Sequence, residues 1–380
     1  MNCLVCKCAE MITVLELGHY YPANKDSFKN KLSLEVAICK FCSTVQIPNR
    51  FSKEVNFPPE YPFRSGITKA LRDNFLDLGE KIANQIPKGS KVLEIGSNDG
   101  TLLSMLKQKE FNVQGVEPTL AYLETNSEIE VIPSFFEDID FTQTFDCVVL
   151  TNTFAHLSDQ VSALKKIRTI LSPNGLIFIE VVDLEQLLAL NEFDKFTHEH
   201  GIYFDRQTLR SVMRSQGFSE VGFERINTHG GSFRATFKNT GEISPMEQSN
   251  VSQTILKFGI LRKKIDEIKI ELPRVLEELG GVGASLFLAG ATTRGEIFVN
   301  ALELDKSRFR AILENPRSKR IGSVMPNLQI EVINDENISE VDSPIVLILA
   351  WHVQDEVVKS LKLVNPSVKC VVALPEIRIV

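Results

Sequence analysis

Short apolar runs alternate with amphipathic stretches along the middle of the chain. The segment KVLEIGSNDG (91–100) is an apolar strand that enters a glycine-containing turn, and TLLSMLKQKE (101–110) has the residue spacing of a helix. A second strand, FNVQGVEP (111–118), follows, and FDCVVL (145–150) and GLIFIEVVD (175–183) have the pattern of two further strands. Strands that alternate with helices in this way predict a doubly wound α/β sheet.

The rest of the pattern predicts the domain organisation. Residues 245–275 have helical spacing and many charges, which is typical of a connecting helix, and the last hundred residues alternate strand and helix patterns again. We therefore expect a small module at 1–57, an α/β domain at 58–244, the connecting helix at 245–275 and a second α/β domain at 276–380.

Length and composition agree with a multidomain globular protein. The chain has 380 residues, which is too long for one ordinary core, and it is 43% hydrophobic and 24% charged. Its net charge of −7 argues against bulk binding to nucleic acid or to a membrane surface. The N-terminus has no targeting pattern, and the apolar stretch PIVLILAWHV (344–353) is too short to span a bilayer. We expect a cytoplasmic protein.

Four cysteines form two C-x-x-C pairs near the N-terminus: Cys3 with Cys6, and Cys39 with Cys42. Two such knuckles can complete a tetrahedral zinc site, and because all four ligands are sulfur the ion is expected to be structural. The alternative is a redox C-x-x-C, which is typical of a single motif inside a βαβ unit. Cys8 is a possible substitute ligand, but it would break the knuckle pattern.

The turn after the first strand predicts the type of nucleotide. It reads Gly96-Ser97-Asn98-Asp99-Gly100, which lacks the G-x-G-x-x-G of dinucleotide-binding sites. Glu117 lies 21 residues beyond Gly96, at the end of the second strand, where a carboxylate can accept hydrogen bonds from ribose hydroxyls. An adenosyl ligand without a pyrophosphate fits best, and S-adenosylmethionine is the natural candidate. The alternative is a Rossmann-like scaffold without a ligand. Further predicted donor contacts are Glu94, Pro118, Asn152 and Thr153.

The segment FTHEHGIYF (196–204) places two histidines on either side of a glutamate. If the backbone is extended, His198 and His200 share one face and Glu199 points away, so one histidine can act chemically while the other is packed. An H-x-H pair with a carboxylate also resembles a non-haem iron site. We disfavour that alternative because no other candidate ligand has fitting spacing and a sulfonium donor needs no metal.

Several motifs together resemble one family. The double C-x-x-C is followed in order by YPFRSG, VLEIGSNDGTLL, GVEPT, NTFAHLSD, FTHEHGIYF, THGGSFR and GATTRGEIF…ENPRSKRIGSVMP. In order and spacing these resemble the S-adenosylmethionine-dependent sugar C-methyltransferases, which modify nucleotide-linked 4-keto-deoxyhexoses. The resemblance implies a zinc-binding module, a class I methyltransferase domain and a C-terminal Rossmann-like domain that helps to enclose the substrate.

The resemblance also implies roles for individual residues. By position, His200 matches the family's base, with Glu199 beside it to orient an imidazole or to bind a sugar hydroxyl. Asn152 and His156 match residues near the methyl donor and the sugar, and Tyr61 matches the first tyrosine of the family's YxYxSS stretch.

The chain departs from the family pattern at two positions. The family often has tyrosine directly before HEH, where this chain has Thr197, and the second tyrosine of YxYxSS is Phe63. Two phenol hydroxyls that line the family's sugar pocket are therefore absent. These two positions bear on which sugar is accepted and on which carbon is methylated.

The expected chemistry is methylation of carbon beside a ketone. His200 removes a proton from C3 of a 4-keto sugar because the pKa of histidine lies near operating pH. The developing oxyanion accepts hydrogen bonds from His156 and from Tyr61 or Tyr203, while Asn152 positions the donor. The methyl group then moves in line from sulfur to carbon, so the protein mainly supplies alignment.

Four further residues are predicted substrate contacts. His198 lies in the HEH segment; His229 and Arg234 flank the Gly-Gly of THGGSFR, which is either a turn beside the sugar or only a hairpin. Arg294 lies at a strand–turn–helix junction that could meet a diphosphate, unless this fold serves only for packing. The basic segment ENPRSKR is either a solvated loop or part of a diphosphate clamp.

These observations predict a zinc-containing C-methyltransferase that acts on a nucleoside-diphosphate 4-keto-deoxy sugar in deoxysugar biosynthesis. The protein is expected to be a monomer or a small homo-oligomer. The alternatives are a sugar O-methyltransferase and a non-catalytic zinc-containing binding protein with a decayed methyltransferase domain. The intact HEH and EIGSNDG motifs and Glu117 speak against the last of these.

Overall fold

The computed structural model describes residues 2–22, 30–280 and 285–380. The chain divides into two compact units, each described by itself below. The first contains Met1–Ile12, Ala37–Gln186 and Glu199–Val251, and the second contains Thr13–Val36, Leu187–His198 and Ser252–Val380. The chain thus leaves the first unit and returns to it twice. The predicted domain boundaries, whose outer ranges include residues outside the described part, stay predictions.

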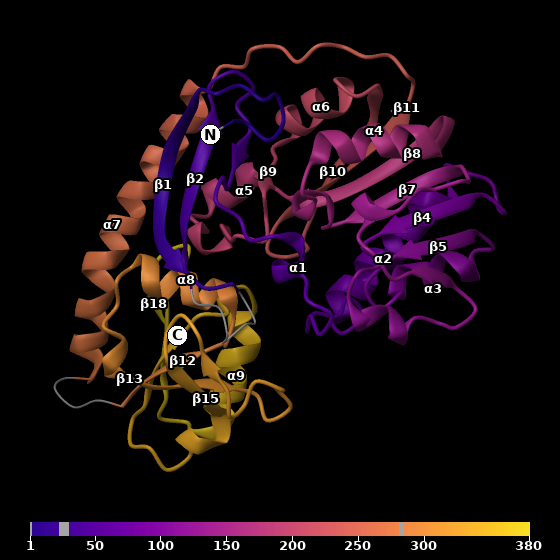
Figure 1. The fold of residues 1–380 in the computed structure, drawn as a ribbon. Coiled ribbons are helices and arrows are strands. Elements are labelled where there is room, and N and C mark those ends of the chain that lie inside the picture. The colour runs from indigo at the N-terminus through magenta and orange to yellow at the C-terminus, as the bar shows by residue number, and fades with distance from the viewer. Residues whose placement is uncertain (1, 23–29, 281–284) are drawn as a thin grey trace. The chain divides into compact units, whose positions relative to one another are not determined.

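A seven-stranded sheet forms the centre of the first unit (Figure 1), in the order β10-β11-β8-β7-β4-β5-β6. The five strands from β8 to β6 in this order pair in parallel, whereas β11 is antiparallel to both β8 and β10. Their bounds are β4 Lys91–Ile95, β5 Asn112–Val116, β6 Glu130–Ile132, β7 Phe145–Thr151, β8 Leu171–Val182, β10 Phe218–Ile226 and β11 Ser232–Asn239.

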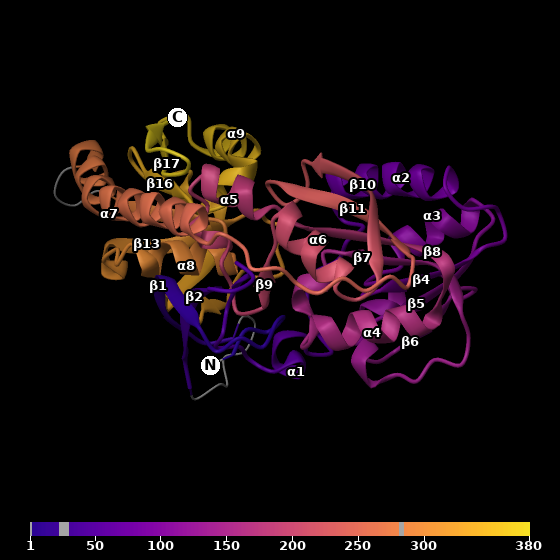
Figure 2. The same ribbon diagram turned by 90° about the horizontal axis from the view of Figure 1, so that it is seen from above.

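The sheet is buried on both faces because its strands are apolar at successive positions. Val92, Val149 and Phe178 belong to a core cluster with α2 (Lys69–Ala83) and α3 (Thr101–Gln108). Their neighbours Leu93, Val148 and Ile177 belong to a cluster with α4 (Gln160–Ile170) and α6 (Arg206–Arg214). Figure 2 shows these two helix pairs on opposite faces of the sheet. The predicted doubly wound α/β architecture is confirmed.

A four-stranded sheet has the order β1-β2-β3-β9. Its strands are β1 Met11–Tyr20, β2 Leu32–Cys39, β3 Val45–Gln46 and β9 Ile202–Tyr203, and the division between the two units runs through β1 and β2. In the first unit β3 pairs with β9, with Val45 opposite Tyr203. This pairing ties the residues after Cys42 to those after His200. The remaining short elements of the N-terminal two thirds are α1 Lys53–Asn56, α5 Leu184–Ala189, and the 3₁₀ helices η1 Leu120–Glu124, η2 Phe136–Asp138, η3 Phe154–His156 and η4 Phe193–Lys195.

The second unit contains another seven-stranded sheet, in the order β14-β15-β13-β12-β16-β17-β18. The five inner strands run parallel to one another: β15, β13, β12, β16 and β17. The edge strands β14 and β18 are antiparallel to their neighbours. The strands are β12 Leu286–Ala289, β13 Phe309–Glu314, β14 Val324–Met325, β15 Ile330–Asn334, β16 Ile345–Ile348, β17 Lys369–Val372 and β18 Arg378–Ile379. The helices are α7 Ser252–Gly280, α8 Thr293–Ala301, α9 Gln354–Val364 and the 3₁₀ helices η5 Lys306–Arg308, η6 Asp335–Ile338 and η7 Trp351–Val353. The predicted second Rossmann-like domain is therefore present.

The connecting helix differs from its predicted bounds of 245–275. Residues 245–250 are not helical, and α7 begins at Ser252 and continues through Pro273 to Gly280. The polar stretch that includes Pro245 offers no apolar stripe, whereas buried side chains recur every three or four residues along α7. These are Phe258, Leu261, Ile265, Ile268, Leu272 and Leu276.

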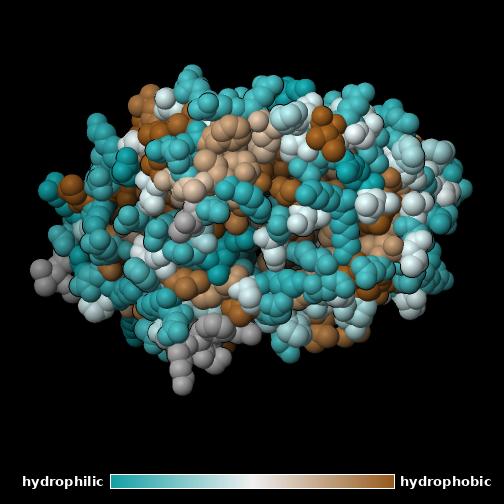
Figure 3. Space-filling view, turned by 45° about the horizontal axis from the view of Figure 1, so that its top comes forward, coloured by the Kyte–Doolittle hydropathy of each residue, from teal (hydrophilic) through white to brown (hydrophobic). Residues whose placement is uncertain are grey.

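The surface in Figure 3 is a mosaic of hydrophilic residues and scattered hydrophobic ones. Among the described residues, none of the helices combines the length and the apolar composition needed to cross a bilayer.

Candidate active site

The turn after β4 is tight and depends on glycine. Gly96 has a φ of +75°, and a Cβ there would lie 2.4 Å from Oγ1 of Thr153, so a larger residue would be both strained and crowded. Glu117 accepts hydrogen bonds at one oxygen from the backbone N–H (2.9 Å) and hydroxyl (2.6 Å) of Thr119. Its other oxygen accepts from the N–H of Asn98 at 2.9 Å. The predicted acid thus lies against the predicted turn.

Three buried polar atoms around this turn have no hydrogen-bond partner in the described part of the chain. They are Oε2 of Glu94, Oγ of Ser97 and Oδ1 of Asn152. Glu94 belongs to β4, and Asn152 follows β7, which pairs beside β4. Ligands of doubly wound sheets bind at such carboxyl ends, where the strand order reverses. Burial and then the carboxylate of Asp99 raise the pKa of Glu94. Unpartnered polar atoms beside a glycine turn fit a polar ligand such as S-adenosylmethionine, for which Pro118 and Gly100 also remain predicted contacts.

A second cluster brings together five residues that were predicted to act on the acceptor. Nδ1 of His156 lies 2.8 Å from the backbone oxygen of Glu199, and the His156 and His200 ring centres are 4.4 Å apart. The ring of His200 stacks on Tyr203 at 5.5 Å. The Tyr61 hydroxyl donates to Oε2 of Glu199 at 3.3 Å. All five belong to the first unit, and the contact between Tyr61 and Glu199 joins residues that are 138 positions apart in the sequence.

The hydrogen bond of His156 determines which of its nitrogens carries the proton. A backbone carbonyl can only accept, so Nδ1 must donate and the lone pair of the neutral ring lies on Nε2. Burial lowers the pKa of His156, which favours the neutral ring, although the bond to Glu199 opposes this shift. A neutral His156 therefore accepts a hydrogen bond at Nε2. This geometry favours a hydrogen-bond acceptor role for Nε2 of His156. The role predicted from the sequence was a hydrogen-bond donor to the oxyanion.

The HEH segment is not extended, so the condition under which its two histidines would share one face is not met. The backbone forms a turn at His198 and Glu199. His198 contacts residues of the second unit, with Nε2 3.1 Å from the backbone oxygen of Ser33, and burial lowers its pKa. This environment favours a packed, structural His198. Its predicted substrate contact has no support from these neighbours.

Arg234 is enclosed by carboxylates and is almost completely buried. It donates to Glu180 at 2.6 Å, to Asp77 at 2.6 Å and to Glu224 at 2.8 Å. These bonds favour an architectural role for Arg234 over the predicted substrate contact. The segment THGG (228–231), which precedes Arg234, is the hairpin turn between β10 and β11. His229 in this turn has a φ of +51°.

Arg294 lies in the second unit, just after the turn that follows β12. Its Nε donates to Oδ2 of Asp194 at 2.8 Å, and its guanidinium lies 5.1 Å from the ring centre of Trp351. The indole of Trp351 donates to the same carboxylate oxygen at 3.2 Å. Sequence reasoning missed Asp194 and Trp351. Asp194 lies 100 positions before Arg294, and Trp351 lies in a later strand–helix unit, so no local motif connects either residue with Arg294.

The four predicted zinc ligands converge. The Sγ atoms of Cys3, Cys6, Cys39 and Cys42 all lie within 4.8 Å of one another. The Cys3–Cys42 and Cys6–Cys39 sulfur distances are 3.6 and 3.5 Å. Tetrahedral zinc with bonds of about 2.3 Å separates its sulfurs by roughly 3.8 Å. Burial raises the pKa of Cys39 to about 12, so a thiolate there needs a nearby cation. The cluster fits zinc.

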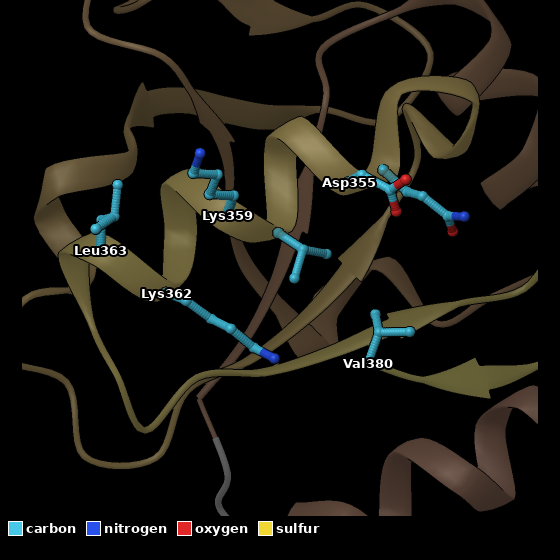
Figure 4. A pocket seen from close by; sticks show the side chains of 7 residues that line it. Asp355, Lys359, Lys362, Leu363 and Val380 are labelled. Carbon is cyan, nitrogen blue, oxygen red and sulfur yellow. The ribbon is translucent and has the colours of Figure 1, made fainter.

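A separate hollow of about 430 Å³ lies against α9 in the second unit (Figure 4). It is lined by Gln354, Asp355, Val358, Lys359, Lys362, Leu363 and Val380. None of the residues predicted from the sequence lines it, and we assign it no role in methyl transfer.

Comparison with known proteins gives matches that cover most of the chain. A methyltransferase domain matches residues 63–221, and a C-methyltransferase C-terminal domain matches residues 227–375. The chain is 27% identical to the C-methyltransferase NovU of Streptomyces niveus, over 91% of this chain and 87% of that one. It is also 27% identical to the human mitochondrial ubiquinone biosynthesis O-methyltransferase, over 39% of this chain and 47% of that one. A solved structure of SAM-bound CalS10, an amino pentose methyltransferase from Micromonospora echinaspora, aligns with 43% of this chain and 90% of that one at 18% identity. Its TM-score of 0.35 is too low to add to the argument.

Proposed function

We propose that this chain, which belongs to the S-adenosylmethionine-dependent C-methyltransferase family, methylates C3 of a nucleoside-diphosphate-linked 4-keto-deoxy sugar. The observation that carries the proposal is the cluster of His200, His156, Tyr203, Tyr61 and Glu199. A base beside two phenols and a second imidazole suits removal of a proton next to a ketone.

The residues around the turn after β4 would hold the methyl donor. Glu117 would bind the ribose hydroxyls, and Glu94, Ser97 and Asn152 would offer their unpartnered polar atoms to the rest of the molecule. When bound, S-adenosylmethionine supplies a methyl group already activated for transfer. The turn at Gly96 allows the backbone to approach it closely.

His200 is proposed to take the proton from C3 of the sugar, which leaves the electron pair in an enolate whose charge lies on O4. Tyr203 or Tyr61 would donate a hydrogen bond to that oxygen. His156 would accept a hydrogen bond at Nε2 and so orient a sugar hydroxyl. The electron pair at C3 then forms the new C–C bond to the methyl group as the bond from that methyl group to sulfur breaks, with its electrons left on sulfur, and His200 releases its proton to water. The products are the C-methyl sugar nucleotide and S-adenosylhomocysteine.

Specificity for the sugar is proposed to differ from that of relatives with two more tyrosines. Phe63 is 44% exposed, and its ring centre lies 6.3 Å from that of His229, the predicted sugar contact. Thr197 is buried. The phenyl ring would make the surface beside His229 less polar. Arg294 stays the candidate for the diphosphate.

We further propose that Cys3, Cys6, Cys39 and Cys42 bind a structural zinc ion. Metal analysis of freshly purified protein should give one zinc per chain, and Cys39→Ser should reduce it. Removal of the metal should lower the thermal midpoint, because binding energy at structural sites is folding energy. Protein that contains no zinc and is unaffected by chelators would contradict this proposal.

The function is tested by incubating the protein and S-adenosylmethionine with a panel of 4-keto sugar nucleotides and reading the product by mass. Carbon NMR with a labelled methyl donor then places the methyl on carbon or oxygen. In D₂O with S-adenosylhomocysteine, the C3 proton of the accepted sugar should exchange with solvent in the wild type and not in His200→Asn. The exposed His19 provides a matched control, and His19→Asn should retain the exchange. A methyl on oxygen, or exchange that survives in His200→Asn, would overturn the proposal.

A further inference from the structure

Residues 59–67, here called the strap, lie against the turn after β4. Oδ1 of Asn98 accepts a hydrogen bond from the N–H of Ser65 at 2.9 Å, and its Nδ2 donates to the backbone oxygen of Phe63 at 3.2 Å. Oδ2 of Asp99 accepts from the N–H of Gly66 at 2.7 Å. The side chains of two turn residues are thus bound to strap backbone.

The fit between strap and turn is close. A Cβ on Gly66 would lie 2.4 Å from Oγ1 of Thr101 and 3.1 Å from Oδ2 of Asp99. The second oxygen of Asp99 accepts from the N–H and the hydroxyl of Thr101 at 3.2 and 2.7 Å. The carboxylate therefore joins the strap to the first turn of α3.

The other end of the strap reaches the acceptor cluster. Tyr61 belongs to the strap, and its hydroxyl donates to Glu199. Arg64 holds the strap in shape, since one guanidinium nitrogen donates to the backbone oxygens of Tyr61 (2.7 Å) and Phe63 (2.9 Å) while its Nε pairs with Glu124 at 2.7 Å. Hydrogen bonds therefore join Asn98 to the backbone at Phe63 and Tyr61, and the side chain of Tyr61 continues this path to Glu199.

We propose that Asn98 and Asp99 are positioning residues, which act through the strap to hold the Tyr61 hydroxyl on Glu199. The donor turn and the acceptor cluster are thereby coupled, so that a ligand on the turn also orders the residues that face the sugar. Because the side chains of Asn98 and Asp99 form hydrogen bonds with the strap backbone, they are not direct side-chain ligands of the methyl donor. The acceptor half of this inference rests on the proposed function, whereas the link between strap and turn does not.

Asn98→Gly isolates the link. Asn98 has a φ of +51°, which glycine adopts without strain, and its own N–H bond to Glu117 does not need a side chain. Asn174 has a φ of +62° and is exposed near the beginning of β8, so Asn174→Gly is the matched control.

The first measurement is amide hydrogen exchange at Ser65 and Gly66, with and without S-adenosylhomocysteine. In the wild type and in Asn174→Gly the ligand should slow exchange at both amides by about tenfold, since each gains the protection of a more persistent hydrogen bond. In Asn98→Gly the Ser65 amide should exchange rapidly even at saturating ligand. Equal protection of Ser65 in Asn98→Gly, or no effect of the ligand on the wild type, would overturn the inference.

The second measurement is a double-mutant cycle on kcat/KM for the accepted sugar nucleotide. Asn98→Gly and Tyr61→Phe should each lower it by about tenfold, and the double variant should lose about tenfold rather than about a hundredfold, because both changes break one path. The Kd of S-adenosylhomocysteine should change much less than kcat/KM in Asn98→Gly. Multiplicative losses, or a matching rise in that Kd, would contradict the coupling. If no sugar nucleotide is methylated by the wild type, the proposed function fails while the exchange experiment still decides the link.

Discussion

The sheets of the two units share a strand order, and the ends of their first two strands differ. In the first unit the order β6-β5-β4-β7-β8 places β4 at the centre, and in the second β15-β13-β12-β16-β17 places β12 there. In each, a glycine with positive φ follows the central strand: Gly96 and Gly290. In each, an acid at or just past the end of the next strand accepts a turn N–H: Glu117 from Asn98 at 2.9 Å and Glu314 from Ala291 at 2.6 Å.

The difference lies in the polar atoms that each turn leaves without partners. β4 ends in Glu94 and Ile95 and is followed by Ser97, and both Glu94 and Ser97 have a buried unpartnered oxygen. The four residues of β12 are all apolar, and a Cβ on Gly290 would lie 2.8 Å from the Cβ of Ala350 in the loop after β16. The two turns share their shape, and the buried unpartnered oxygens at the end of β4 are what favour the first turn as the proposed methyl-donor site. Function follows from those few side chains and not from the sheet.

The largest expected effect is a change in the free energy of unfolding when a buried charged side chain is replaced in each unit. Arg234→Met would leave the buried Glu180 without its positively charged partner and, among the described residues, with only the Nδ2 of Asn74 as a donor, and should lower the free energy of unfolding by about 3–5 kcal/mol. In the second unit, Glu296 is buried and accepts from the N–H and Nδ2 of Asn327 at 2.8 and 2.9 Å. Burial raises the pKa of Glu296, so its charge contributes less than that of Glu180, but both of its oxygens accept hydrogen bonds. Glu296→Gln would set an amide N–H against one Asn327 donor and should cost about 1–3 kcal/mol, less than Arg234→Met.

Denaturant unfolding measures both variants. The affinity for S-adenosylhomocysteine, extrapolated to the folded fraction, should be unchanged in Arg234→Met if this residue is architectural. Loss of acceptor binding in a stably folded Arg234→Met would instead restore the substrate contact predicted from its sequence position.

The next prediction compares Glu117 and Glu314, the two acids that accept a hydrogen bond from an N–H of each turn. Glu117→Ala should weaken binding of S-adenosylhomocysteine about a hundredfold, because it removes charged hydrogen-bond acceptors for the ribose. Glu314→Ala should leave this affinity within about twofold, since among the described residues the end of β12 has no buried side-chain oxygen without a partner. Calorimetric titration gives both values. Equal losses would mean that the assignment of the donor to the first turn is wrong.

The sequence predicted those features that depend on local spacing. Apolar strands, the Gly96 turn, Glu117 and the two cysteine pairs lie as expected, because each is defined by residues a few positions apart or by the end of a strand. The environments of His198, Arg234 and Asn98 could not be predicted in this way. Their partners are Ser33, Glu180 and Ser65, which are brought near only by tertiary packing. An isolated polar residue in a motif therefore did not reveal whether its side chain faces a ligand or the protein.

The smallest expected effect tests the state of His156 through pH. Burial lowers the pKa of His156 in the folded protein below the value of about 6.5 in an unfolded chain. Below about pH 6.5 the unfolded chain therefore binds a proton that folded His156 resists, so stability is lost as pH falls from that value toward the folded pKa. Asn can keep a donor near the position of Nδ1 for the Glu199 carbonyl but has no ring to protonate, so His156→Asn should unfold with a weaker pH dependence between pH 7.5 and 5. His198, whose pKa burial also lowers, contributes in the same direction and remains in the variant. Urea unfolding at several pH values compares the slopes, and an unchanged slope in His156→Asn would mean that this ring is already free to charge in the folded state.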